Sequence, residues 1–273
     1  MSKRISPITG ANGRTRWALA GLVIISAAIS AGARPAAAQD VATPSGYQFF
    51  VTPYLWMPSV HATTKTPLAR EPEVNSNVSF IDLLSHLDGA PFMGSAEVRY
   101  GQLGFLAGYL HLPVSTNITT HNIFFQGGTA ELAANVGSGI ALYRVLDDPV
   151  QYADAGLGFR AWGFSADLGL NPGLLQGVSV SRSAGWTDPL IAARYYRDLG
   201  NGFGLTAYGD FGGFGVGAHV DWQVLGTIDY FPKPWLNIQL GYRSLNFNIT
   251  GSEGRFGFDV HMRGPIIAGT FRF

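Results

Sequence analysis

The chain of 273 residues contains no cysteine, and neither sign of charge is in excess. The absence of thiols excludes disulfide bonds, thiolate metal sites, cysteine nucleophiles and a cysteine-linked lipid anchor. Eighteen Lys and Arg against 18 Asp and Glu remove the basic bias expected of a nucleic-acid-binding protein. A composition of 47% hydrophobic and 13% charged residues also excludes a disordered chain. We therefore expect a folded protein that binds no nucleic acid.

Acidic residues are absent from residues 1–38, which contain five basic residues. Basic residues come first, an apolar run covers 17–30, and three alanines occupy 36–38. Regions in this order are typical of a secretory signal peptide, and the apolar run is shorter than the roughly 20 residues that a membrane-spanning helix needs. We predict that residues 1–38 are a cleaved signal peptide. Residues 39–273 then form the exported protein, with 13 basic and 18 acidic residues.

No second apolar run long enough for a membrane helix follows the predicted signal peptide. The repeated feature is period-two alternation. In 203–211 the odd positions are apolar or small, whereas the even positions include Thr206 and Asp210, and segments 220–230 and 236–243 alternate in the same way. This pattern predicts strands with one apolar and one polar face. A water-soluble sandwich would show the same pattern, so alternation alone does not identify the solvent.

The connections between the predicted strands alternate in length. Tight links are expected at 101–102, 147–149, 200–202 and 232–234, and longer polar or glycine-rich loops at 61–90, 118–127, 167–186, 212–218 and 250–255. Short turns at one rim and long loops at the other are typical of outer-membrane β-barrels. Aromatic residues near the strand ends fit the interfacial girdles of such barrels. These residues are Tyr100, Tyr195, Tyr230, Phe231, Trp235 and Phe271.

The sequence therefore predicts an all-β fold, an antiparallel transmembrane β-barrel of about ten strands. The predicted strands are 46–60, 91–100, 103–117, 128–146, 151–166, 187–198, 203–212, 219–231, 235–249 and 256–273. An even number lets the first and last strands pair, which leaves no unsatisfied sheet edge in lipid. If 73–80 and 174–184 are wall strands and not loop hairpins, the number is about twelve. If two pairs are misjudged, it is about eight.

Four runs of the sequence resemble a known family. They are Trp186–Tyr195, Tyr208–Gly217, Gly241–Arg243 and Gly264–Phe273. The chain resembles a family of largely uncharacterised Gram-negative outer-membrane β-barrel proteins, over most of its predicted exported part. The resemblance implies outer-membrane lipid as surroundings and insertion by the barrel assembly machinery, which in such proteins recognises a last strand ending in an aromatic residue.

Two aromatic residues of the last strand, Phe271 and Phe273, match that membrane-insertion signal. The resemblance implies no established activity. It therefore predicts a cellular location, the outer membrane, and leaves the function to be argued from the residues themselves.

Turning the polar face of each predicted strand toward the barrel axis brings charges of both signs together. The expected lumen-lining residues are Glu97, Arg99, Asp154, Arg160, Asp188, Arg194, Asp210, Asp221, Asp229, Arg243 and Asp259. A barrel of about eight to ten strands has an interior that side chains can fill, and ion pairing offsets the cost of burying each charge. We expect a charge-paired polar core with a structural or interaction role. A narrow passive conduit for ions or small solutes, with these charges setting selectivity, is an alternative.

A rim-active hydrolase acting on lipid or peptide is a further alternative. Asp210 ends one predicted strand, and His219 and Asp221 begin the next, so a histidine oriented by a carboxylate would be placed to act as a general base. Ser181 and Ser183, in the preceding long loop, are the candidate nucleophiles. Because the sequence has no Gly-x-Ser-x-Gly and no His-Glu-x-x-His motif, we expect a protein that is not an enzyme.

The six histidines are scattered along the chain. They are His61, His86, His111, His121, His219 and His261. None forms an i, i+4 pair on a predicted helix, so we expect no metal site, and nothing in the sequence indicates a cofactor.

Residues 79–87 have helical spacing, with Phe80, Leu83 and Leu84 on one side and Ser79 as a candidate N-cap to Asp82. We expect a short helix in the first long loop. It either caps the mouth of the barrel or lies on the membrane surface.

Overall fold

The computed structural model describes residues 46–65, 73–118, 125–250 and 257–273, which all belong to one compact unit. The predicted signal peptide lies outside the described residues, as does His121. Within the described ranges no helix is long and apolar enough to span a membrane. The structure of these ranges is almost entirely antiparallel β-sheet.

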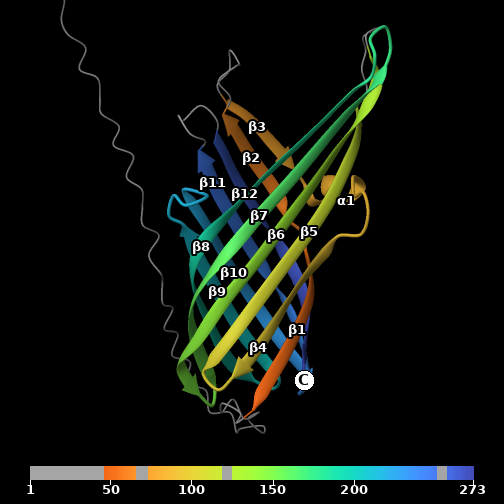
Figure 1. Ribbon diagram of the computed structural model, residues 1–273. Coiled ribbons are helices and arrows are strands. Elements are labelled where there is room, and N and C mark those ends of the chain that lie inside the picture. Colours follow the sequence, from red (N-terminus) through yellow and green to blue (C-terminus); the bar gives the residue numbers. More distant parts are fainter. Residues whose placement is uncertain (1–45, 66–72, 119–124, 251–256) are drawn as a thin grey trace, which may run out of the picture. The chain divides into compact units, whose positions relative to one another are not determined.

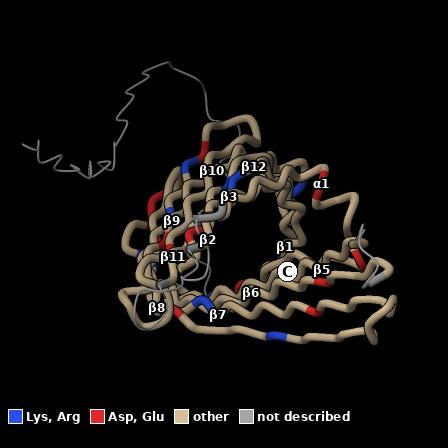
Figure 2. Tube along the Cα trace, turned by 90° about the horizontal axis from the view of Figure 1, so that it is seen from above, with Lys and Arg blue, Asp and Glu red and all other residues tan. Residues whose placement is uncertain are grey.

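Ten strands form a closed antiparallel barrel (Figures 1 and 2). They are β1 (Tyr47–Trp56), β4 (Phe92–Tyr100), β5 (Leu103–Ile118), β6 (Phe125–Asp148), β7 (Gln151–Pro172), β8 (Val178–Gly200), β9 (Phe203–Gly213), β10 (Val220–Lys233), β11 (Leu236–Thr250) and β12 (Gly257–Arg272). Each pairs with the next, and β12 returns to β1, where Leu55 faces Ile267. Backbone hydrogen bonds between Phe49 and Phe273 extend this seam. The predicted fold class and number of wall strands are confirmed.

Two further strands extend the wall at the long-loop end. β2 (Ser59–Lys65) pairs with the first half of β12, and β3 (Glu73–Val78) pairs with β2. Residues 73–78 are thus a strand of a hairpin that is added to β12, and they do not enlarge the closed ring. The count of ten wall strands is unchanged.

The long loop predicted at 167–186 is mostly strand. β7 continues to Pro172, and β8 begins at Val178 and pairs with β7 as far as Leu170 facing Val178. The physical reason is that the alternation of apolar and polar residues continues through this segment. Leu168, Leu170 and Val180 are separated by small or polar residues, a pattern that suits paired strands. The strands β5 to β8 therefore project beyond the closed ring (Figure 1).

The expected short helix is present as α1 (Phe80–Ser85). The Ser79 hydroxyl accepts a hydrogen bond from the backbone N–H of Asp82, and the Asp82 carboxylate accepts one from the backbone N–H of Ser79, which makes a capping box. Hydrogen bonding to Ser79 lowers the pKa of Asp82. No residue of α1 is buried, and Ile81 is 70% exposed. The helix lies beside β5 (Figure 1) and contributes nothing to the apolar cluster inside the barrel.

The tight connections gather at one rim, here called the short-turn end. Between β8 and β9, Gly200, Asn201 and Gly202 all have positive φ, from 56° to 82°. Glycine adopts this left-handed conformation without steric cost, and asparagine tolerates it better than most residues. The sequence at 200–202 therefore favours a turn that brings β9 directly alongside β8.

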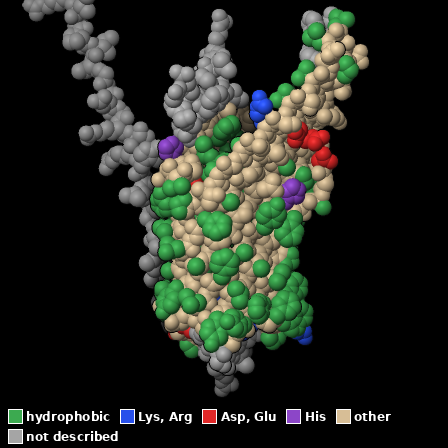
Figure 3. Space-filling view, viewed as in Figure 1, with side chains coloured by type: hydrophobic (Ala, Val, Ile, Leu, Met, Phe, Trp, Pro, Cys, Tyr) green, Lys and Arg blue, Asp and Glu red, His purple; other side chains and the backbone are tan. Residues whose placement is uncertain are grey.

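The outward face of the wall is apolar over most of its height. Leu157, Ile228 and Leu240 are 58% to 68% exposed, and Figure 3 shows apolar side chains spread over the outer wall. At the short-turn end the outward aromatic rings pair across strands, with centroid distances of 4.9 Å for Tyr47 and Tyr100 and 5.0 Å for Phe203 and Tyr230. The predicted girdle residues Tyr100 and Tyr230 are therefore at this rim on the outer face, whereas Phe231, also predicted for the girdle, lies in the lumen against Tyr196.

The apolar face changes sides toward the long-loop end. In β11, Leu240 and Tyr242 are exposed on the outer face, but Leu245 and Phe247 are buried inside. The alternate positions Ser244 and Asn248, which are partly exposed, carry polar side chains on the outer face, and Asn246 between them is buried there against His261. The barrel thus has two zones. One is apolar outside and polar inside, and the other is polar outside and apolar inside.

Candidate functional site: the barrel lumen

An ionic cluster lies on the β4 to β8 side of the lumen near the short-turn end. Arg194 of β8 donates to Glu97 of β4 at 2.6 Å and to Asp154 of β7 at 2.7 Å. Arg99 lies 3.0 Å from both carboxylates, and Arg144 donates to Asp154 at 3.0 Å. Because β4 and β8 are four strands apart in the ring, the pair formed by Arg194 and Glu97 connects the two ends of the part of the wall that is formed by β4 to β8.

A second ionic cluster lies nearer the middle of the barrel. Arg160 of β7 donates to Asp210 of β9 at 2.7 Å and is also hydrogen-bonded to Asp221 of β10. The indole N–H of Trp162 donates to Asp221 at 3.0 Å, and the Tyr208 hydroxyl donates to Asp210 at 2.8 Å. These two carboxylates are buried, so they depend on this one guanidinium for charge compensation.

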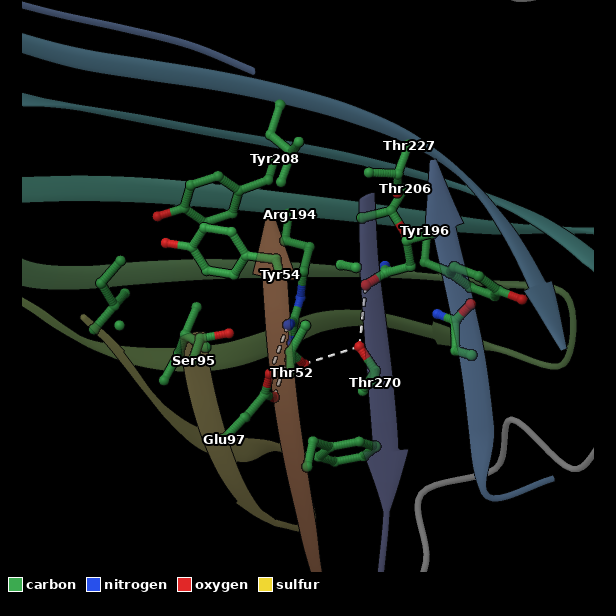
Figure 4. Close-up of a pocket in the computed structure, with 18 of the residues that line it drawn as sticks. Thr52, Tyr54, Ser95, Glu97, Arg194, Tyr196, Thr206, Tyr208, Thr227 and Thr270 are labelled. Carbon is green, nitrogen blue, oxygen red and sulfur yellow. Dashed lines mark hydrogen bonds and ion pairs between the residues drawn. The ribbon is translucent and has the colours of Figure 1, made fainter. Parts of the chain in front are cut away.

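The opposite side of the lumen is lined mainly by hydroxyl and amide groups around the Asp229 carboxylate. A chain of hydrogen bonds runs from Thr52 to Thr270 at 2.8 Å, to Gln239 at 3.0 Å, to Asp229 at 2.6 Å and to Thr206 at 2.6 Å. It links the five neighbouring strands β1, β12, β11, β10 and β9, and Figure 4 shows its threonines around the pocket. Hydroxyl and amide groups compensate the buried carboxylate of Asp229, with no cation in ion-pair distance among the described residues.

Arg243 of β11, which is partly buried, differs from the other arginines of the lumen. It donates to the Gln223 side chain at 2.5 and 2.9 Å and to the Tyr54 hydroxyl at 3.2 Å. Its guanidinium lies 4.5 Å from the centre of the Trp56 ring. Within the described part of the chain, no carboxylate is within ion-pair distance of Arg243.

A cavity of about 370 Å³ lies between these groups. Its walls include Asp198 and Trp235 at the short-turn end and Tyr54 and Leu110 near mid-height. Figure 4 shows Arg194 and Glu97 on one side of this pocket and Thr206, Thr227 and Thr270 on the other. We call this space the chamber. It extends from the short-turn rim toward the middle of the barrel.

A buried apolar cluster fills the lumen beyond the chamber. Its members are Trp56, Met93, Leu110, Val136, Trp162, Leu245, Phe247 and Ile266. The ring centroids of Trp162 in β7 and Phe247 in β11 are 4.5 Å apart, and those of Trp186 and Phe247 are 5.4 Å apart. β7 and β11 are four strands apart around the wall, so this contact crosses the lumen. We call these side chains the aromatic layer.

The structure places ten of the eleven expected lumen residues in the interior. They are Glu97, Arg99, Asp154, Arg160, Asp188, Arg194, Asp210, Asp221, Asp229 and Arg243. Asp188 is buried near the aromatic layer, where its carboxylate accepts hydrogen bonds from the Ala218 backbone at 2.6 Å and from the Trp186 indole at 2.9 Å. The interior charges are thus distributed over several clusters and do not form one ring.

The expectation for Asp259 is wrong. Its neighbours Val260 and Met262 pack on the interior cluster, and alternation therefore puts Asp259 on the outer face. Its side chain is 44% exposed and lies 3.1 Å from the His261 ring. We predicted that the polar face points inward along the whole strand, but toward the long-loop end the polar face of β12 is the outer one.

The aromatic layer was not expected from the sequence. The layer uses the same strand faces as the inward arginines. Trp162 is on the face of β7 that carries Arg160, and Leu245 and Phe247 are on the face of β11 that carries Arg243 nearer the short-turn end. A signal for it exists in β11, where the apolar positions change from even numbers to odd numbers just after Arg243. A change of phase of this kind marks the height at which the outer face passes from an apolar to an aqueous environment.

The catalytic candidates are not brought together. His219 is exposed. The carboxylates of Asp210 and Asp221 accept their hydrogen bonds from Arg160, Trp162 and Tyr208. No histidine is among the partners of these carboxylates in the described ranges. Ser181 donates instead to Asp167. The described residues also contain no group of three or more side chains placed to bind a metal ion.

The two residues of the expected insertion signal lie at the short-turn end. Phe271 stacks on Trp235 with ring centroids 6.3 Å apart. Phe273 is 75% exposed, and its backbone N–H donates to the Phe49 carbonyl at 2.9 Å. The last residue of the chain therefore takes part in the seam that closes the barrel.

No protein-family model and no curated protein matches this chain. Its fold is similar to solved outer-membrane β-barrels. The outer membrane protease OmpT from Escherichia coli matches with a TM-score of 0.55 at 10% identity, over 85% of this chain and 98% of that one. A weaker match is Ail, the attachment invasion locus protein of Yersinia pestis, with a TM-score of 0.36 at 12% identity, over 84% of this chain and 100% of that one. Another is the P. putida toluene transporter TodX, with a TM-score of 0.33 at 8% identity, over 84% of this chain and 90% of that one.

The match to OmpT at this low identity shows the fold alone. The chain has the fold of Gram-negative outer-membrane β-barrel proteins. The comparisons support this class of fold and identify no particular family within it.

Proposed function

We propose that this chain is an integral protein of the Gram-negative outer membrane with a closed lumen and a structural or interaction role. Its contact with lipid is supported by the outward apolar band, in which Leu157, Ile228 and Leu240 are all more than half exposed. A contiguous apolar surface of this kind marks membrane contact. The ten-stranded ring supports the same proposal because it leaves no wall strand unpaired in lipid.

The orientation that we propose puts the short turns in the periplasm and the extended ends of β5 to β8 outside the cell. Short periplasmic turns and longer outer loops are the usual arrangement of such barrels. Export by the predicted signal peptide and insertion by the barrel assembly machinery through Phe271 and Phe273 belong to this proposal.

The closed lumen is the observation that carries the functional part of the proposal. The Trp162 and Phe247 rings meet across the barrel at 4.5 Å, and the buried cluster around them leaves the chamber on one side only. Ions would have to cross an apolar layer, which is costly for any charged solute. The paired charges near the short-turn end therefore serve stability and binding, and a passive conduit has less support.

Planar-bilayer recordings test the closed lumen. We expect a flat current trace from the wild-type protein and stepwise conductance from the double variant Trp162→Ala/Phe247→Ala, because truncating both rings removes the contact that crosses the barrel. The control is Trp222→Ala/Phe211→Ala, which removes the same two ring types from a cross-strand pair on the outer face, and we expect it to stay flat. Steady conductance by the wild-type protein would refute the closed lumen.

A hydrolytic role has no comparable support. It requires a histidine hydrogen-bonded to a carboxylate, and the exposed side chain of His219 has no such partner in the described residues. We accordingly propose a protein without catalytic activity.

A further inference from the structure

The surface of the chamber is richer in cations than in anions. Six arginines line it, against the three acidic residues Glu97, Asp198 and Asp210. Asp154 and Asp221, which pair with several of these arginines, have exposures of 1% and 0% and lie outside the chamber lining. The chamber lining therefore contains more guanidinium groups than carboxylates, although the interior as a whole contains many carboxylates.

Arg243 has donors available for a ligand. A guanidinium carries five N–H groups. Three of them are used, since Nε and Nη2 each donate to Gln223 and Nη1 donates to Tyr54. One N–H group thus remains on each Nη atom, and two such groups can act as the fork that binds a carboxylate or phosphate with two parallel hydrogen bonds. The stacking on Trp56 at 4.5 Å holds the plane of this fork.

Other buried polar atoms of the chamber lining also lack partners. Arg99 is 3% exposed, and its Nη1 atom makes no hydrogen bond in the described structure. The same is true of Asp210 Oδ1 and Asn237 Oδ1. Buried polar groups are normally hydrogen-bonded.

Aromatic rings complete the lining. Phe50, Tyr208, Phe231 and Trp235 line the chamber together with the arginines. A volume of about 370 Å³ is in the range of pockets that bind small organic molecules. Rings beside a cationic fork suit a ligand with an apolar body and an anionic group.

We propose that the chamber is a binding site for a small organic anion with a cyclic or aromatic body, and that Arg243 anchors its anionic group. Because the chamber reaches the short-turn rim, the ligand enters from that side. Entry from the periplasm rests on the orientation proposed above, whereas binding by purified protein does not. Binding at this site is also independent of whether the lumen conducts.

Calorimetric titration of the purified barrel in detergent micelles tests the site. The probes are benzoate, phenyl phosphate, benzyl alcohol and benzylamine, which share a ring and differ in charge. We expect saturable binding of at least one of the two anions, and binding at least tenfold weaker for the alcohol and for the amine. Comparison of benzoate with phenyl phosphate shows which anionic group fits. Equal binding of benzylamine and both anions, or no binding of either anion, would overturn the proposal.

Variants locate the anchor. Arg243→Gln keeps hydrogen-bonding capacity but removes the charge and the fork, so we expect at least a tenfold loss of anion affinity. Arg182→Gln removes an exposed arginine of β8 outside the chamber lining and is expected to leave affinity unchanged. Unchanged affinity in Arg243→Gln, or an equal loss in both variants, would refute the role of Arg243. If Arg243→Gln does not fold, the charge series on the wild-type protein still decides whether the chamber selects anions.

Discussion

Replacing Arg160 with methionine is expected to lower the free energy of unfolding by about 3–5 kcal/mol, the usual cost of removing one partner from a buried ion pair. Arg160 is 2% exposed and pairs with both Asp210 and Asp221. Methionine fills much of the same volume but leaves two buried carboxylates without their cation. Trp162 and Tyr208 would still donate hydrogen bonds to them, which does not offset the charge.

Urea unfolding of the protein in lipid vesicles, followed by tryptophan fluorescence, measures this effect. Arg182→Met is the matched control, because Arg182 is exposed and surface changes are usually within about 0.5 kcal/mol. Adding Asp210→Asn and Asp221→Asn to Arg160→Met removes the uncompensated charges and is expected to restore part of the loss. Stability of Arg160→Met equal to that of the wild-type protein would show that the central ionic cluster does not stabilise the barrel.

Replacing Gly158 with valine is expected to have a similarly large effect through packing. A Cβ atom at Gly158 would lie 2.1 Å from the carbonyl oxygen of Gly139 and 2.8 Å from Cα of Ile140. Both are backbone atoms of β6, which is paired with β7 at this position. The steric clash can be removed only if β6 and β7 separate at this point. We therefore expect the free energy of unfolding to fall by about 3 kcal/mol or more.

The refolded fraction, measured by heat-modifiable migration in electrophoresis, tests this prediction. Gly226→Val is the control, because a Cβ atom at Gly226 would meet nothing within 4 Å and valine favours strands. We expect little refolded Gly158→Val and a normal yield of Gly226→Val. Equal yields would mean that β6 and β7 do not approach each other as closely as described.

The fold could be predicted from the sequence because alternation is a local property. The pattern in 203–211 is visible in the letters alone, and β9 covers Phe203–Gly213. Positive φ at Asn201 and the adjoining glycines likewise follows from local chemistry. Strand lengths were harder to predict, since β7 and β8 extend beyond the ring with a pattern that also suits a loop hairpin.

The interior could be predicted only in part. The sequence indicates that Glu97 and Arg194 point inward, but not that they meet, because they are 97 positions apart in the chain and their contact depends on the width of the closed ring. The aromatic layer and the outward position of Asp259 depend on where the outer face stops being apolar. That height is a property of the assembled barrel, and a rule applied strand by strand cannot detect it.

The apolar outer face of the wall contacts lipid if the barrel has the proposed orientation. Because the chain has no cysteine, single cysteines at Ala96, Ile228 and Ser95 can carry spin labels without other changes. Ala96 and Ile228 are exposed on the outer face, whereas Ser95 lines the chamber. Power-saturation measurements in lipid vesicles should show that labels at Ala96→Cys and Ile228→Cys are accessible to oxygen and protected from a water-soluble nickel complex, and that the label at Ser95→Cys lacks this lipid signature. High accessibility of the two outer labels to the nickel complex would contradict the account.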